Sequence, residues 1–122
     1  MKKLITFVII AYLSFTINSG VIAQEQNVLR IGVLLPLSGK FQKVGESFLK
    51  AIQLALFDIS NKNIKIYLKD TKANALNAYR SAKEFQEDGI EIVIGPIFYE
   101  SLKKLGELDK ITFISFTNRT EK

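Results

Sequence analysis

Apolar and polar positions along the chain alternate between two recurring patterns. Leu29–Leu35 is a short, nearly continuous apolar run that Pro36 closes. A run of that length ended by a breaker is typical of a strand buried on both faces. The apolar residues that follow recur at steps of four, three, one and three, which places them on one face of a helix over Glu46–Ser60. The residues of this face are Phe48, Ile52, Ala55, Leu56 and Ile59.

The strand–helix alternation then repeats. Ile64–Leu68 alternates well enough to predict a second strand, which ends at Asp70. Asn74 has the side chain of a helix N-cap, and Gly89 stands where a left-handed C-terminal cap is needed. The buried face of the helix between these two caps is predicted to consist of Ala75, Ala78, Tyr79, Ala82 and Phe85.

A third strand–helix unit and a fourth strand complete the pattern. Ile92–Ile94 predicts a strand stopped by Gly95 and Pro96, and Glu100–Leu108 predicts a short helix that buries three leucines. Ile111–Phe116 predicts the fourth strand. The inward leucines of the short helix are Leu102, Leu105 and Leu108.

This order of elements predicts an α/β fold. Strands that alternate with helices through short loops form a parallel sheet in three layers, with helices on both faces. We expect the strand order 2-1-3-4, with the first and third strands adjacent at the centre. No helix pattern follows the fourth strand, so we expect the sheet to be an incomplete part of a larger lobe.

The N-terminal residues have the pattern of an export signal. Lys2 and Lys3 precede an uncharged, mostly apolar stretch of 14 residues, Leu4–Ile17, and small residues then lead to Ala23. This order predicts a signal peptide over residues 1–23 that is cleaved after Ala23, and a domain over residues 24–122. As a helix, the stretch would rise about 21 Å, short of the roughly 30 Å hydrocarbon core. An uncleaved membrane anchor remains the alternative.

Charge and composition exclude several classes of function. Removal of Lys2 and Lys3 would lower the formal net charge from +5 to +3, and the remaining lysines are scattered, so no nucleic-acid partner is expected. The sequence contains no cysteine and no histidine. It therefore offers no disulfide framework, no thiolate metal site, no residue for a bacterial lipoprotein anchor and no imidazole base. We predict neither a metal nor a cofactor.

The glycine-containing loops do not match nucleotide-binding motifs. Ser38-Gly39-Lys40 resembles the end of a phosphate-binding loop, but Leu34 and Phe41 occupy the positions that require glycine and serine or threonine. A dinucleotide fingerprint is missing as well, which favours Asp70 as a turn residue over a ribose-binding acid. No nucleophile, base and stabiliser converge in the pattern, so we expect no enzymatic activity.

Candidate ligand contacts follow from position in the predicted sheet. Open parallel sheets bind ligands outside the carboxyl ends of their strands, where the connections switch faces. Hydroxyl, amide and aromatic side chains stand at those ends, although ordinary loop and lid residues would have the same composition. The candidate residues are Ser38, Phe98, Tyr99, Ser101, Thr117 and Asn118.

Four short motifs, Ile31–Gly39, Gly45, Asp70–Thr71 and Ile94–Pro96, occur in a defined order and spacing. In that order they resemble the opening of the leucine-binding-protein-like (type I) periplasmic binding proteins, and the resemblance covers Val28–Asn118. Two further segments are similar to the penicillin-binding-protein activators within that superfamily. These segments are Ala51–Asp58 and Phe113–Thr117.

The resemblance implies a non-catalytic periplasmic domain, of which this chain holds part of the first lobe. Activators bind a penicillin-binding protein, a cell-wall synthase, and regulate peptidoglycan synthesis. Transport members instead bind amino acids or other small solutes and deliver them to an ABC permease. Amino-acid binders carry small hydroxyl residues after the third strand, whereas this chain has Ile97-Phe98-Tyr99. That departure favours the activator, while the missing cysteine departs from lipoprotein activators. No membrane span is expected to remain after signal cleavage.

Overall fold

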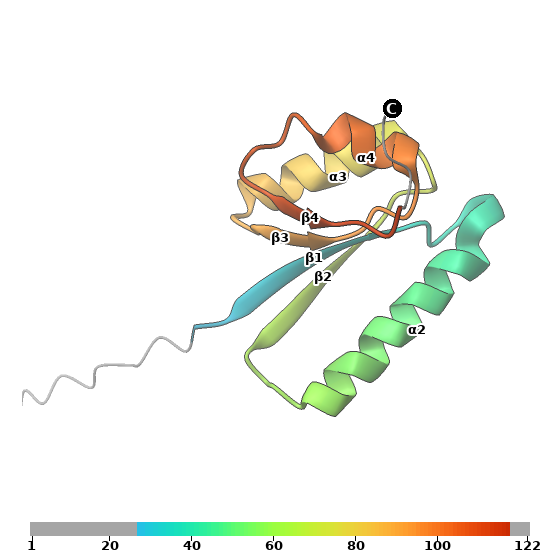
Figure 1. Cartoon of the computed structure of the whole chain (residues 1–122). Helices are drawn as coiled ribbons and strands as arrows, with labels where there is room; N and C mark the ends of the chain where they lie inside the picture. The colour runs from blue at the N-terminus through green and yellow to red at the C-terminus, as the bar shows by residue number, and fades with distance from the viewer. Residues whose placement is uncertain (1–26, 118–122) are drawn as a thin grey trace, which may run out of the picture.

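The computed structural model describes residues 27–117, which form one parallel sheet with the strand order β2-β1-β3-β4 (Figure 1). The strand order and the parallel pairing confirm the prediction from the sequence. The strands are β1 (Leu29–Leu35), β2 (Ile64–Asp70), β3 (Ile92–Ile94) and β4 (Thr112–Ile114). The helices are the 3-10 turn η1 (Gly39–Phe41), α2 (Gln42–Ile59), α3 (Ala75–Glu87) and α4 (Tyr99–Leu105).

The helices divide between the two faces of the sheet. α3 and α4 lie together on one face, and α2 lies alone on the other (Figure 1). Crossovers between parallel strands are right-handed. The connection from β1 to β2 runs in one direction across the strand order, and the connections from β2 to β3 and from β3 to β4 run in the other, so their helices cover opposite faces. The predicted three-layer architecture is confirmed.

The hydrophobic core lies between the sheet and the layer of α3 and α4. Phe85 of α3 rests on Gly32 of β1, where an added Cβ would lie 2.7 Å from the phenyl ring. Only glycine therefore lets α3 approach β1 this closely. The buried residues of this core are Leu34, Ala82, Phe85, Ile90, Val93, Leu105, Leu108 and Ile111.

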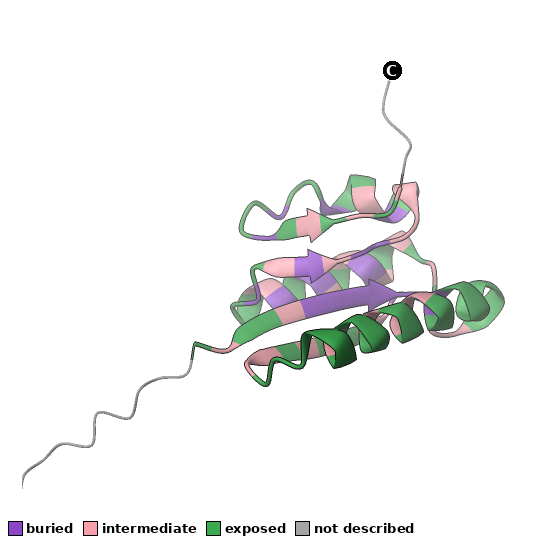
Figure 2. Ribbon diagram, turned by 60° about the horizontal axis from the view of Figure 1, so that its bottom comes forward, coloured by how far each residue is buried: buried purple, intermediate pink, exposed green. Residues whose placement is uncertain are grey.

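α2 is less buried against the sheet than the sequence predicts. Its expected apolar face is at most half-buried, and Ala55 and Ile59 are exposed, Ile59 by 58%. Gly45 is the buried residue of this helix, and Figure 2 shows α2 exposed along most of its length. The prediction of a buried face is wrong for Ala55 and Ile59. The close contact with the sheet is made instead at Gly45, where an added Cβ would lie 2.0 Å from the carbonyl oxygen of Pro36.

The helix caps were predicted correctly, whereas the start of α2 was not. The Asn74 side chain accepts hydrogen bonds from the N–H groups of Leu76 and Asn77, and Gly89 has φ +70°, so both predicted caps are confirmed. The start predicted for α2 at Glu46 is wrong, because η1 leads directly into a helix that begins at Gln42. The first turn holds Gln42, Lys43, Val44 and Gly45, and its one large apolar residue, Val44, is too little to show a helical spacing.

The last two elements are shorter than predicted. α4 ends at Leu105 rather than Leu108, although Leu108 is still buried in the turn that follows. β4 ends at Ile114 rather than Phe116. The apolar pattern continues past the end of each element: Leu108 is buried in the turn, whereas Phe116 is 45% exposed.

Candidate functional site

One carboxylate joins the carboxyl ends of β1 and β2. Asp70 Oδ1 accepts hydrogen bonds from the Leu37 N–H at 2.8 Å and from the Lys72 N–H at 2.8 Å. Its second oxygen, Oδ2, accepts one from the Ser38 hydroxyl at 2.6 Å. Asp70 thus fastens the loop after β1 to the turn after β2, which confirms its interpretation as a turn residue.

The electrostatics of Asp70 follow from these contacts. Burial raises the pKa of the carboxyl group. This effect is outweighed by the hydrogen bonds that the carboxylate accepts from Ser38 and from the Lys72 and Leu37 N–H groups, and by the positive charge of Lys72. The net result is a pKa below the ordinary value. Asp70 is therefore ionised at neutral pH, and the Ser38 hydroxyl is committed to it as a donor.

The turn after β2 holds two consecutive residues in the left-handed region. Lys72 has φ +52° and Ala73 has φ +53°, a conformation that costs a non-glycine residue about 1–2 kcal/mol. Two local hydrogen bonds hold the turn in place: Asp70 accepts from the Lys72 N–H, and the buried Thr71 hydroxyl oxygen accepts from the Ala73 N–H at 3.3 Å. The turn is strained and is supported by its own side chains.

Two pairs of phenylalanine rings cross the carboxyl edge of the sheet. Phe41 and Phe98 have ring centroids 4.7 Å apart at an interplanar angle of 55°. Phe48 and Phe116 have centroids 4.5 Å apart at 47°. The pairs join η1 and α2 to the segments that follow β3 and β4, and contacts of this kind contribute about 0.5–1.5 kcal/mol beyond area burial. The edge is therefore lined with aromatic carbon, with the Lys40 ammonium 5.4 Å from the Phe41 centroid.

The predicted site residues differ in how they are placed. Ser38, Phe98 and Thr117 follow β1, β3 and β4, so they stand at the same edge of the sheet. Tyr99 is half-buried at the first position of α4, and Ser101, within α4, is only 2% exposed. Asn118 lies outside the described residues, as does the predicted signal peptide.

Sequence reasoning missed most of the aromatic lining. Phe41, Phe48 and Phe116 were not among the candidates, although Phe41 directly follows the first loop and Phe116 the fourth strand. The positions of Phe41 and Phe116 near strand ends were the available signal, whereas Phe48 lies within α2. Ser115 was missed as well, and its hydroxyl donates to the Pro96 carbonyl oxygen at 3.0 Å.

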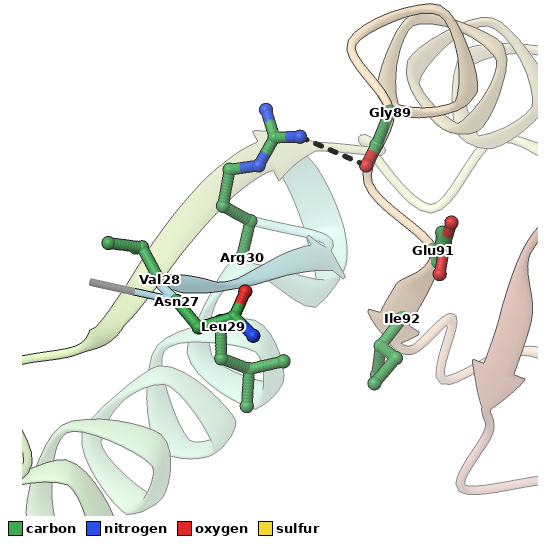
Figure 3. Close-up of a pocket in the computed structure, with 7 residues that line it drawn as sticks. All are labelled: Asn27, Val28, Leu29, Arg30, Gly89, Glu91 and Ile92. Atoms are coloured by element: carbon green, nitrogen blue, oxygen red, sulfur yellow. Dashed lines mark hydrogen bonds between the residues drawn. The ribbon is translucent and has the colours of Figure 1, made fainter. Parts of the chain in front are cut away.

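A cavity of about 450 Å³ lies at the opposite edge of the sheet, at the amino ends of β1 and β3 (Figure 3). The Arg30 guanidinium beside it donates to the carbonyl oxygens of Asp88 at 2.9 Å and Gly89 at 3.2 Å. These carbonyls end α3, so Arg30 caps that helix. The lining residues are Asn27, Val28, Leu29, Arg30, Gly89, Glu91 and Ile92. Because ligands of parallel sheets bind at carboxyl ends, the aromatic edge remains the candidate site.

Between residues 27 and 117, no group of acidic, histidine or cysteine side chains is placed to hold a metal ion. Within the same residues, no helix combines the length and the apolarity that crossing a membrane requires.

The sequence matches the protein family described as "LppC putative lipoprotein" over residues 11–116. This chain belongs to that family. A search of curated proteins found no match. The 122 residues include no cysteine, so the sequence lacks the thiol that carries the lipid of bacterial lipoproteins.

Solved structures similar to this chain fall into two groups. Full-length LpoA from Haemophilus influenzae is 25% identical with a TM-score of 0.62, over 75% of this chain and 17% of LpoA. The LpoA C-domain from the same organism, described as a regulator of PBP1A, is 23% identical with a TM-score of 0.60, over 70% of this chain and 27% of that domain.

The second group consists of solute-binding proteins. An ABC transporter protein from Rhodopseudomonas palustris BisB5, solved with 3,4-dihydroxy benzoic acid, has a TM-score of 0.69 and 23% identity, over 73% of this chain and 27% of that one. A leucine-binding protein from Thermotoga maritima has a TM-score of 0.66 and 20% identity, over 72% of this chain and 27% of that protein. The fold is that of type I periplasmic binding proteins, and the chain spans at most 27% of each of these structures.

Proposed function

We propose that this chain is a non-catalytic, periplasmic domain that binds a penicillin-binding protein and thereby regulates peptidoglycan synthesis. The observation that carries the proposal is the aromatic lining of the carboxyl edge, where the tilted rings of Phe41 and Phe98 lie in contact. Aromatic side chains are enriched at the buried centres of protein interfaces. The family match and the similarity to LpoA, a regulator of PBP1A, support the same function.

The serines at this edge argue against an amino-acid ligand. A buried carboxylate needs hydrogen-bond donors, because an unpaired buried charge is costly. Ser38 already donates to Asp70, Ser115 donates to the Pro96 carbonyl, and Ser101 is buried within α4. These three hydroxyls are therefore not available to donate hydrogen bonds to a ligand carboxylate at this edge.

A binding measurement with a purified PBP1A-type synthase tests the proposal. We expect the exported chain to bind the synthase and to change its rate of glycan polymerisation. Phe98→Ser and Phe41→Ser should weaken binding at least tenfold, because each removes one ring of this aromatic pair. Phe57→Ser is the matched control: its ring is 78% exposed on α2, away from this edge, so its affinity should equal that of the wild type. Equal affinities for all four proteins, or no binding, would refute the proposal.

A solute-binding component of an ABC transporter is the second candidate. The similarity to a binding protein solved with 3,4-dihydroxy benzoic acid favours it, since the Phe41–Phe98 pair places aromatic carbon at this edge. Titration calorimetry with this acid and with leucine, isoleucine, valine and alanine separates the candidates. We expect no amino acid to bind below about 10 µM, equivalent to roughly −7 kcal/mol. A tighter amino-acid complex would favour transport over regulation.

A further inference from the structure

The loop that leads from β1 to α2 is fastened by the Asp70 carboxylate. The Leu37 N–H donates to Oδ1 at 2.8 Å, and the Ser38 hydroxyl donates to Oδ2 at 2.6 Å. Ser38 is the residue before η1, but its side chain does not cap this turn, because its hydroxyl is directed at Asp70. Gly39, which follows, has φ +78°, and a Cβ added there would meet no described atom within 4 Å. Packing at Gly39 therefore does not fix the start of η1, whereas the hydrogen bonds to Asp70 do.

The sheet holds Asp70 in place. Asp70 is the last residue of β2 and pairs in register with Leu35, which is fully buried. The next residue, Thr71, is also buried and donates its N–H to the Leu35 carbonyl at 2.9 Å. The Lys72 N–H donates to the same Asp70 oxygen that accepts from Leu37. The carboxylate is thus a fixed point to which the loop is attached, since groups on strands are held more precisely than groups on loops.

The loop ends at one of the two rings on which the proposed interface depends. Phe41 is the last residue of η1, three positions after Ser38. Its ring lies against that of Phe98, with the centroids 4.7 Å apart, and Phe98 directly precedes α4. Three residues make a single 3-10 turn. A shift of the loop at Ser38 would therefore move the Phe41 ring relative to Phe98.

We propose that Asp70 is a positioning residue for partner binding: through Leu37 and Ser38, its carboxylate sets where the Phe41 ring lies against Phe98. The inference rests on the proposed function, in which the two rings contact a penicillin-binding protein. Asp70 acts through Phe41 and does not contact the partner itself, because its oxygens are engaged by three donors within the chain. Holding the ring in place favours binding, since ordering a mobile side chain on association costs entropy.

NMR of the exported, purified chain with labelled phenylalanine measures the positions of the two rings without a partner. Each ring shifts the resonances of the other at their observed separation. We expect Asp70→Ala to move the ring resonances of Phe41 and Phe98 toward those of free phenylalanine. Ser38→Ala removes one of the three hydrogen bonds and should move them less, in the same direction. The Phe85 resonances should stay in place and verify that each variant is folded, because Phe85 is buried in the α3–α4 core.

The effect on the partner is measured by binding to the purified PBP1A-type synthase. We expect Asp70→Ala to weaken binding about threefold to tenfold. Asp70→Asn should weaken it less, because the amide keeps one oxygen for the N–H groups of Leu37 and Lys72. In the Phe41→Ser background, Asp70→Ala should change the affinity by less than about twofold, because the ring through which it acts is absent. A purely structural role for Asp70 would instead weaken both backgrounds by the same factor.

Asp109→Asn is the matched control for these measurements. Asp109 is an exposed carboxylate that precedes β4, and it lies at the opposite edge of the sheet from Asp70, which ends β2. We expect this variant to have the ring resonances and the synthase affinity of the wild type.

Three outcomes would overturn the inference: unchanged Phe41 and Phe98 resonances in Asp70→Ala, a wild-type synthase affinity of that variant, or an equal loss of affinity with and without the Phe41 ring. If Asp70→Ala does not fold, the same three outcomes are read from Ser38→Ala. A wild-type chain that does not bind the synthase would refute the proposed function. The ring resonances would then decide by themselves whether Asp70 positions Phe41.

Discussion

Replacement of Asp70 by asparagine should loosen the connection between the carboxyl ends of β1 and β2. The carboxylate accepts three hydrogen bonds, from the Leu37 N–H, the Lys72 N–H and the Ser38 hydroxyl. A hydrogen bond to a charged group contributes about 1.5–3 kcal/mol and a neutral one about 0.5–1.5 kcal/mol. Asparagine keeps one oxygen and loses the charge. If each of the three bonds weakens by about 1 kcal/mol, the free energy of unfolding falls by about 3 kcal/mol. Partial exposure reduces this figure, and we expect about 1–2 kcal/mol.

Urea unfolding followed by circular dichroism measures this loss and its dependence on pH. Because the folded-state pKa of Asp70 lies below its ordinary value of 3.8, the ionised form stabilises the folded chain. Its contribution is fully present above the unfolded pKa and is lost as the pH falls through the folded pKa. The difference in unfolding free energy between wild type and Asp70→Asn should therefore be constant from pH 5 to 7 and should shrink below about pH 4.

Asp109→Asn provides the control, because Asp109 is an exposed carboxylate in the turn between α4 and β4. We expect its unfolding free energy to differ from the wild type by less than about 0.5 kcal/mol. The reasoning fails if Asp70→Asn is as stable as the wild type at pH 7. It also fails if the difference between the two proteins is the same at pH 3 as at pH 7.

The remaining predictions concern two backbone positions and the N-terminus. Gly45→Ala should destabilise the chain by about 1–3 kcal/mol in the same urea assay, because its Cβ would meet the Pro36 carbonyl. Gly106→Ala is the control and should be nearly neutral, because its Cβ has no neighbour closer than 3.6 Å. Ala73→Gly should raise stability by up to about 1 kcal/mol, since relief of the left-handed strain exceeds the added chain entropy; an unchanged or lowered midpoint would contradict this. Mass spectrometry of the exported protein should show cleavage after Ala23, and an intact N-terminus would favour the membrane anchor.

The arrangement of the elements could be predicted because its signals are local. The apolar run that Pro36 ends, the helical spacing from Phe48 to Leu56 and the alternation in β2 each depend on a few neighbouring residues. Asn74 and Gly89 mark helix ends through their own side-chain and backbone chemistry. The regular alternation of strands and helices, with right-handed crossovers, then leaves few possible strand orders. The predicted parallel order 2-1-3-4 is the order observed.

The contacts at the carboxyl edge were decided by the tertiary structure. The residues of the pairs Ser38–Asp70, Phe41–Phe98 and Phe48–Phe116 are far apart in the sequence, and no periodic pattern relates them. They meet because the parallel register brings the ends of all four strands to one edge. Burial on α2 depended on the tertiary structure in the same way. Spacing placed Phe48, Ile52 and Ile59 on one helix face, but how closely that face approaches the sheet depends on the packing of Gly45 against Pro36. Local chemistry thus determines which elements form and in what order, whereas contacts between distant residues depend on how those elements pack.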